Sequence, residues 1–332
     1  MFRTGVQVLR RITTPSEAAE DYSAIAEAVL QALLPHVIAE VARRHGPPPG
    51  EGVAILAMGK LGSGEMTARS DLDLIIVYDA PLDASSDGPR PLATPAWYAR
   101  FAQTLVAALS APTAQGLLYE VDMRLRPSGR QGPVAIALSR FARYQAEEAW
   151  TWEHLALTRA RVVAGARPVC AALAQVITDV LGRPRGPEAL TDVRSMRRRL
   201  AEAKGEGGPW ELKDGAGRIL DIELLLQTGR MLTPGVQAVS PTQMIAGLAG
   251  AGWLARDQAD HLRSHLGQLM TVQQITRLAL DGPYDPQKGG PGLAQFLAEA
   301  AGCSDIEALG ARLAADSTKA AAIIETVLGD DA

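Results

Sequence analysis

One stretch decides the fold, residues 53–74, which reads VAILAMGKLGSGEMTARSDLDL. Its apolar first part, bounded by glycines, is typical of a buried strand, and Gly62-Ser63 belongs to a short turn that follows. Asp71 and Asp73 then stand at the start of a second strand, where residues i and i+2 point to the same face. Two adjacent carboxylates repel each other unless a cation lies between them, and Mg²⁺ with nucleotide phosphates is the usual occupant of such an oxygen site. The pattern therefore indicates a metal-dependent nucleotidyl transfer centre.

A second charged strand is expected further along the chain. Residues 118–126 alternate apolar and charged side chains, which predicts a strand with one face in the core and the other facing a wet site. The charged face carries Glu120, Asp122, Arg124 and Arg126. Such a density of charge is uncommon on a strand that does not line a site, so we expect Asp122 to join the two earlier carboxylates.

Asp71, Asp73 and Asp122 would together complete a two-metal site. One Mg²⁺ would bind a triphosphate and the other would lower the pKa of the attacking hydroxyl, which stabilises both ends of an in-line displacement. A lone aspartate near a strand end is also common as a turn or N-cap residue. The glycine turn before the pair and the acidic strand after it favour the metal site.

Residues 59–64 offer a place for a phosphate. Backbone N–H groups at Gly62, the Ser63 hydroxyl and Lys60 are the candidate contacts. The spacing is not that of a Walker A motif, and a glycine-rich turn alone is more often only a tight connection. Arg124 and Arg126 are further candidates to bind phosphate or to offset the acidic cluster, with salt bridges to Glu120 and the aspartates as the alternative.

Composition limits the class of protein. A chain of 332 residues that is 47% hydrophobic can bury a sizeable core and is expected to form two domains. A net charge of −4 argues against nucleic acid as a general partner. Cys170 and Cys303 have no spacing that suits zinc and are expected to be free buried thiols in a reducing compartment. Residues 1–12 lack an apolar signal region, and no run approaches the roughly 18–20 apolar residues of a membrane span, so we expect a cytoplasmic protein.

The hydrophobic pattern predicts a small mixed sheet with helices, followed by an all-helical domain. Helices are expected over 17–45, bent or divided at Pro35, and over 97–110; strands are expected over 53–58, 72–78 and 134–138. From about residue 141 the pattern is helical, with breaks at 182–187, 205–209 and 282–292. The predicted division is an N-terminal helical segment over 1–50, a nucleotidyltransferase domain over 51–168 and a helical domain over 169–332.

A pair of tryptophans and a pair of histidines can each be interpreted in structural or in functional terms. Trp150 and Trp152 are interpreted as core or interdomain packing rather than base stacking. His261 and His265 have a helical i, i+4 spacing that could bind metal, but no third ligand is near, which favours a solvated helix face.

Several motifs together resemble the bacterial glutamine-synthetase adenylyltransferase family, the bifunctional adenylyltransferase/adenylyl-removing enzymes. They are LAMGKLG at 56–62, SDLDLI at 70–75, YEVDMRLRPSG at 119–129, EAWTWEH at 148–154, LTRAR at 157–161, and the segment from 212–213 to DIE at 221–223. The resemblance covers nearly the whole chain. It implies an α+β fold, with a DNA-polymerase-β-like nucleotidyltransferase domain followed by a helical bundle.

The resemblance also implies an activity: transfer of AMP from ATP to a tyrosine hydroxyl of glutamine synthetase, with release of pyrophosphate and with two Mg²⁺ ions. The family's full-length enzyme resembles two tandem copies of this unit with opposing activities. The motifs around Glu120 and at 150–154 resemble the C-terminal, adenylylating copy. Phosphorolytic removal of AMP, or a catalytically silent regulatory half that binds PII signalling protein or glutamine, are the alternatives.

In the helical domain, the resemblance draws attention to Lys213, Asp221 and Glu223. They could position a substrate or a regulatory ligand. The favoured interpretation is an ion pair at the entry of a helix.

Overall fold

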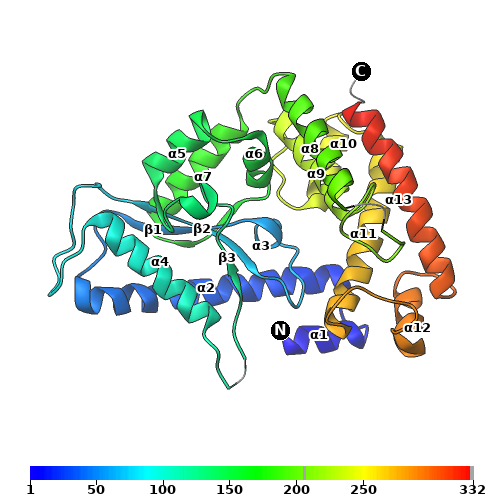
Figure 1. Ribbon diagram of the computed structural model, residues 1–332, viewed down its shortest axis with the longest axis horizontal. Helices are drawn as coiled ribbons and strands as arrows, with labels where there is room; N and C mark the ends of the chain where they lie inside the picture. Colours follow the sequence, from blue (N-terminus) through cyan, green and yellow to red (C-terminus); the bar gives the residue numbers. More distant parts are fainter. Residues whose placement is uncertain (115, 205–206, 330–332) are drawn as a thin grey trace. The chain divides into compact units, whose positions relative to one another are not determined.

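The computed structural model describes residues 1–114, 116–204 and 207–329 of the chain (Figure 1). The chain divides into two compact units. The sheet unit consists of residues 23–66 and 70–183, and the helical unit consists of residues 1–22, 67–69 and the chain from Pro184 onward.

The described residues of the sheet unit form a sheet of five strands. They are β1 (Gly52–Ala57), β2 (Leu72–Asp79), β3 (Val121–Asp122), β4 (Ile136–Ala137) and β5 (Arg161–Gly165). The order is β3-β2-β1-β5, and β4 also pairs with β2. β1 runs antiparallel to both β2 and β5, whereas β2 runs parallel to β3 and β4. The predicted mixed sheet is confirmed, as is the α+β class.

Helices cover both faces of this sheet (Figure 1). They are α2 (Pro15–His45), α3 (Gly59–Ser63), α4 (Thr94–Ser110), α5 (Leu138–Glu147), α6 (Thr151–Leu157) and α7 (Arg167–Leu181). Leu56, Ile75 and Val77 form one core with α5 and α7. Tyr78 points to the other face and stacks on Tyr98 of α4, with ring centroids 4.1 Å apart. Both strand faces are therefore buried, which explains why β1 and β2 read as continuous apolar runs.

Three expectations about this unit need correction, and one is narrowed. Of the two alternatives for Pro35, division of the helix is excluded, because α2 runs through this residue. The predicted strand over 118–126 is reduced to Val121–Asp122, and the chain then turns. The helical interpretation after residue 141 missed β5, a short strand rich in β-branched valine. The predicted boundary at 168/169 falls inside α7, which packs on the sheet, and the structural boundary lies at 183/184.

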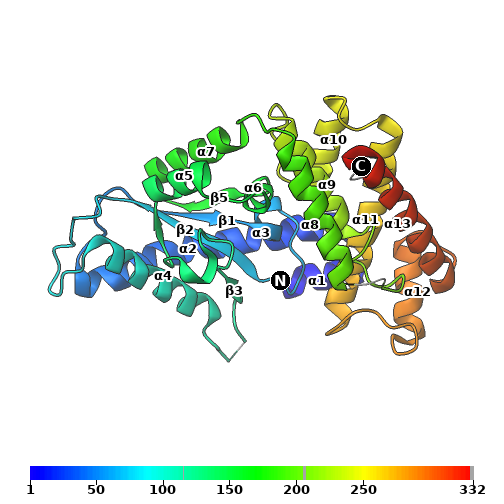
Figure 2. The same ribbon diagram turned by 45° about the horizontal axis from the view of Figure 1, so that its top comes forward.

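The helical unit contains only helices among its described residues. They are α1 (Phe2–Leu9), α8 (Glu188–Lys204), α9 (Ile219–Leu232), α10 (Pro241–Gly250), α11 (Arg256–Ala279), α12 (Gly290–Ala300) and α13 (Ile306–Leu328), besides the start of α2. Figure 2 shows α8, α9, α11 and α13 side by side, with α9 almost entirely buried. The predicted break at 182–187 falls between α7 and α8. The one at 282–292 begins between α11 and α12 but extends into the first turn of α12, which starts at Gly290. Within the third, residues 205 and 206 lie outside the described part of the chain.

His265 corrects the expectation of a solvated histidine face on α11. Its side chain is fully buried, and its Nε2 lies 3.1 Å from Ser317 Oγ and 3.2 Å from Gly217 O. Burial lowers the pKa of His265 to about 4, so the ring is neutral at physiological pH. This histidine is a core residue rather than a metal ligand.

One helix in the described part of the chain, α2, is long and apolar enough to cross a bilayer by length and composition, contrary to the sequence-based expectation. Its apolar side is used in packing here, because Ala26, Leu30, Val37 and Val41 are buried. Cys170 and Cys303 are free, as expected, but half-buried rather than buried.

Candidate active site

The three predicted metal-ligating aspartates come together at the edge where β2 begins. Asp71 stands just before β2, Asp73 is its second residue, and Asp122 of β3 is the direct partner of Asp73 in the parallel ladder. One carboxylate oxygen from each side chain can be chosen so that all three lie within 4.8 Å of one another. Asp71 is exposed and the other two are half-buried, so the cluster is open to solvent on one side. A set of hard oxygen donors at this spacing fits a divalent cation such as Mg²⁺.

The pKa of Asp73 shows that the three carboxylates repel one another when no cation is bound. Burial and, after it, the negative charges of Asp71 and Asp122 raise the pKa of Asp73 to about 6. Arg159 and Arg124 oppose this effect with their positive charges. A bound cation would remove the repulsion and favour the ionised carboxylate.

Asp122 is held by its neighbour in sequence, Arg124. The Arg124 side chain forms an ion pair with Asp122 and donates from Nε at 2.6 Å, and the Arg124 backbone N–H donates to Oδ1 at 2.8 Å. These bonds lower the pKa of Asp122, so this carboxylate is ionised at neutral pH. Arg124 itself remains largely exposed, which leaves its outer edge accessible to a phosphate. Of the two alternatives open for Arg124, the structure shows the salt bridge.

Arg126 does not share this face, which corrects the alternating-strand expectation. Its guanidinium donates to the carbonyls of Met123 at 2.6 Å, of Gly132 at 3.3 Å and of Arg130 at 3.4 Å. Because the strand ends at Asp122, Arg126 lies inside a compact loop and braces it. Glu120 is exposed, and its backbone carbonyl accepts from Leu72 N at 2.9 Å.

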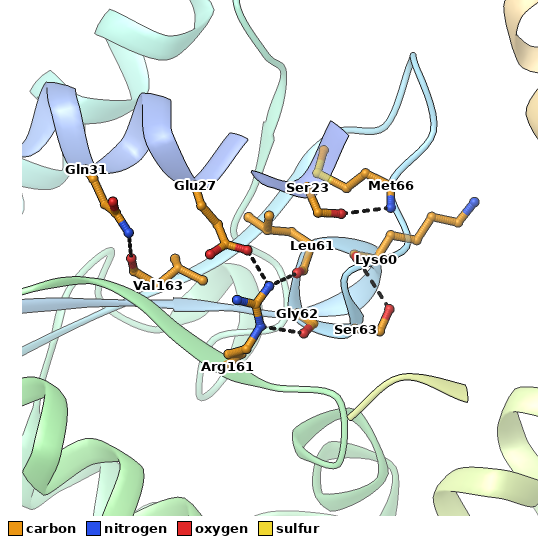
Figure 3. Close-up of polar contacts among 10 residues, drawn as sticks. All are labelled: Ser23, Glu27, Gln31, Lys60, Leu61, Gly62, Ser63, Met66, Arg161 and Val163. Carbon is orange, nitrogen blue, oxygen red and sulfur yellow. Dashed lines mark hydrogen bonds and ion pairs between the residues drawn. The ribbon is translucent and has the colours of Figure 1, made fainter. Parts of the chain in front are cut away.

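The predicted phosphate turn is the short helix α3, and glycine is required at both of its ends. Gly59 has φ +53°, and a Cβ added there would lie 2.2 Å from Asp73 Oδ2, so the backbone passes directly beside that carboxylate. A Cβ on Gly62 would lie 2.1 Å from the Arg159 carbonyl oxygen. Ser63 is buried, and its hydroxyl donates to Lys60 O at 3.3 Å (Figure 3). Lys60 and Ser63 therefore stand on the turn that touches the acidic cluster.

Sequence reasoning assigned no role to two arginines of the 157–161 segment. Arg159 acts on Asp73 through its charge and presses its backbone carbonyl against Gly62. Arg161 donates to the carbonyls of Leu61 and Gly62 in α3, as Figure 3 shows. The signal available in the sequence was two arginines at i, i+2 within a segment whose valines predict a strand.

The helical-unit candidates do not form one site. Asp221 is buried and forms a two-point ion pair with Arg197 at 2.7 and 3.1 Å, not with Lys213. It lines a cavity of about 280 Å³, whereas Lys213 lines a different cavity of about 230 Å³. The expected ion pair at a helix entry exists, but its cation comes from α8. Glu223 is buried on α9 and lines neither cavity.

Trp150 and Trp152 are not core residues of the sheet unit, which corrects that part of their interpretation. Their exposed fractions are 70% and 44%. Glu153 and His154 are the buried side chains of this segment, and Glu153 accepts from Trp150 N at 2.9 Å and from the Tyr144 hydroxyl at 3.0 Å.

Comparison with known proteins identifies the family. The sequence model of glutamate-ammonia ligase adenylyltransferase matches residues 1–176, just over half of the chain. The chain belongs to the glutamate-ammonia ligase adenylyltransferase family. The model of a second family, PII-uridylyltransferase, matches residues 193–326 of the same chain.

Curated relatives agree with this assignment. A bifunctional glutamine synthetase adenylyltransferase/adenylyl-removing enzyme of Xanthobacter autotrophicus is 43% identical over 98% of the chain and 34% of its own length. Proteins of the same name from Bradyrhizobium diazoefficiens and Rhodopseudomonas palustris are 41% and 40% identical, over 94% and 99% of the chain. The chain spans about a third of the length of these relatives, 34%, 32% and 34% respectively.

Proposed function

We propose that this chain transfers AMP from ATP to a tyrosine hydroxyl of glutamine synthetase. The observation that carries the proposal is the convergence of Asp71, Asp73 and Asp122 beside the α3 turn in a member of an adenylyltransferase family. The bond that forms joins the phenolic oxygen to the α-phosphorus of ATP. The bond that breaks joins that phosphorus to the bridging oxygen of the departing pyrophosphate, and the phenolic proton leaves to a carboxylate of the cluster or to water.

The protein's own groups would divide this work. Asp71, Asp73 and Asp122 would hold Mg²⁺, which supplies neutralisation of phosphate charge and activation of a hydroxyl whose pKa in free tyrosine is about 10. Arg124 keeps Asp122 ionised. We therefore assign Asp122 the role of a cation ligand rather than that of the base that takes the phenolic proton. Lys60 and Ser63 would bind the phosphates, together with the outer edge of Arg124. The backbone of Gly62 is not a candidate donor, because its N–H already donates to Met58 O at 2.9 Å. With this substrate we propose a cytoplasmic location.

The direction of the reaction is tested by one assay. The chain is incubated with Mg·ATP and unmodified glutamine synthetase, and the intact mass of the synthetase is followed. We expect the added mass of one AMP per modified subunit, located on a tyrosine by fragmentation. No added mass, with Mg·ATP bound normally, would contradict the proposal. Repeating the assay with PII protein and with glutamine tests the two regulators that the resemblance implies.

The second candidate is the reverse modification, because the names of the relatives include adenylyl removal. In that reaction phosphate attacks the α-phosphorus of the tyrosine-bound AMP and releases ADP and the free phenol. Adenylylated glutamine synthetase with phosphate and the chain would then yield ADP. A chain that binds no Mg·ATP and catalyses neither reaction would be a silent regulatory half.

Cation binding is expected to depend on pH. The pKa of Asp73 is about 6, so protons compete with the cation below that pH and are released when it binds. We expect Mg²⁺ to raise the unfolding temperature of the chain more at about pH 8 than at about pH 5, and to bind at least about tenfold more tightly. Thermal unfolding over a Mg²⁺ titration at both values measures this. Equal Mg²⁺ affinity at the two values would show that Asp73 is not a ligand.

A further inference from the structure

We propose that Arg161 is a positioning residue that clamps the α3 turn in place for nucleotide binding; this inference rests on the proposed function. Arg161 is the first residue of β5, where it pairs with Ala57, the last residue of β1 before the turn. Its Nε donates to Gly62 O and its Nη2 donates to Leu61 O, both at 3.2 Å. One guanidinium thus binds two successive carbonyls of α3 (Figure 3).

The carbonyls of so short a helix need partners from outside. α3 has five residues, and the carbonyls in the last turn of a helix have no intrahelical partner. Gly64, in the left-handed conformation at φ +77°, ends the helix and supplies one N–H to Leu61 O. Glu65 N–H donates to Lys60 O at 2.8 Å. Arg161 adds a second donor to Leu61 O and supplies the donor to Gly62 O, and its positive charge suits the negative end of a helix.

Glu27 of α2 holds the Arg161 guanidinium in the position from which it binds the α3 carbonyls. It forms an ion pair with Arg161 Nη2, the group that also reaches Leu61 O. Exposed fractions of 35% for the Arg161 side chain and 21% for that of Glu27 show a pair that is partly shielded from water. In such a setting a charge-assisted hydrogen bond is stronger than on an open surface.

The same face of α2 holds the segments on either side of the clamp. Ser23, Glu27 and Gln31 are spaced by four residues and therefore lie one above another on the helix. Ser23 Oγ accepts from Met66 N at 3.2 Å, just after α3, and Gln31 Nε2 donates to Val163 O at 2.9 Å, in β5 (Figure 3). One face of α2 therefore binds Arg161, the segment after α3 and strand β5, and so helps to hold the turn in position.

The clamp acts at the opposite end of the turn from the acidic cluster. Gly59, at the start of α3, lies beside Asp73, and Gly62 lies between Arg161 and the Arg159 carbonyl. Of the proposed phosphate contacts, Lys60 stands between these two anchors and Ser63 directly follows the second. Loss of the Arg161 anchor would leave the aspartates in place on their strands but free the turn to move, and about 1 Å of misplacement is enough to weaken such a site strongly.

The test compares Arg161→Ala with the control Gln31→Ala, which removes a bond from the same face of α2 to β5 without touching α3. We expect Arg161→Ala to weaken Mg·ATP binding and to raise KM for ATP about tenfold or more, with a smaller effect on kcat. Arg161→Lys, which keeps the charge but cannot span two carbonyls, should resemble Arg161→Ala. Gln31→Ala should retain wild-type affinity, and the Mg²⁺-induced rise in unfolding temperature should be unchanged in all three.

The outcomes separate this inference from the proposed function. Wild-type affinity for Mg·ATP in Arg161→Ala or Arg161→Lys would overturn the inference alone. Equal loss of affinity in Gln31→Ala would also overturn it, because the effect would then follow general destabilisation. A wild-type chain that binds no Mg·ATP would overturn the proposed function, and the inference with it.

Discussion

Asp73→Asn is expected to abolish AMP transfer and, in the absence of metal, to make the chain more stable. The two effects have one cause. Asp73 is held next to Asp71 and Asp122, and burial together with their charges raises its pKa to about 6. An asparagine has nearly the same shape but no charge, so the repulsion disappears together with the ability to bind a cation.

The sign of the stability effect follows from the direction of the pKa shift. Asp73 binds its proton more tightly in the folded chain than in the unfolded chain, so its contribution to stability is present below its unfolded pKa of about 4 and is lost as the pH rises through about 6. At neutral pH the folded chain carries this penalty and Asp73→Asn does not. We expect the free energy of unfolding to increase by about 1–2 kcal/mol, discounted for solvent access to the cluster.

Transfer is expected to fall by about a thousandfold or more, since both ends of the displacement depend on the cation. Labelling of glutamine synthetase from α-labelled ATP measures the first effect, and thermal unfolding in EDTA measures the second. Asp79→Asn is the matched control: the same substitution at the other end of β2, away from the cluster. Full labelling by Asp73→Asn, or a lower unfolding temperature in EDTA, would contradict the site assignment.

The acidic cluster could be predicted from sequence because it depends on local rules. Alternation in a strand places Asp71 and Asp73 on one side, and a charged segment with an apolar partner face pointed to Asp122. The predicted length of the Asp122 strand was wrong, because tertiary contacts override the local pattern there. The alternation of residues 118–126 reads as a long strand, but Arg124 folds back on Asp122 and Arg126 binds carbonyls of its own loop, so the strand stops after two residues.

Long-range partners were beyond the reach of the sequence for the same reason. Nothing local connects Arg161 with Leu61, which lies 100 residues away, or Asp221 with Arg197, 24 residues away. His265 was misread because helical spacing shows that two side chains share a face without showing which face is buried. Such contacts become visible only when the register of β1 against β5, or of α9 against α8 and α11, is known.

Gly62→Ala is expected to cost the chain both stability and nucleotide binding. A Cβ at this position would lie 2.1 Å from Arg159 O and 2.7 Å from Ala57 O, and both obstacles are backbone atoms that cannot move like a side chain. Relief requires α3 to leave β5, which breaks the Arg161 contacts as well. Overpacking of this kind costs typically about 1–3 kcal/mol, and the loss of the Arg161 bonds adds to it, so we expect a fall in unfolding temperature of about 10 °C.

The control for Gly62→Ala is Gly267→Ala in the middle of α11, where an added Cβ meets nothing within 4 Å. There the methyl group should stabilise the helix by up to about 1 kcal/mol, because alanine favours a helix over glycine. Thermal unfolding and Mg·ATP titration of both variants measure the difference. A Gly62→Ala chain with the unfolding temperature and ATP affinity of the wild type would mean that α3 is not pressed against β5. In that case the turn could not owe its position to the 159–161 segment, and the phosphate contacts would have to be sought elsewhere on the edge that carries Asp71 and Asp73.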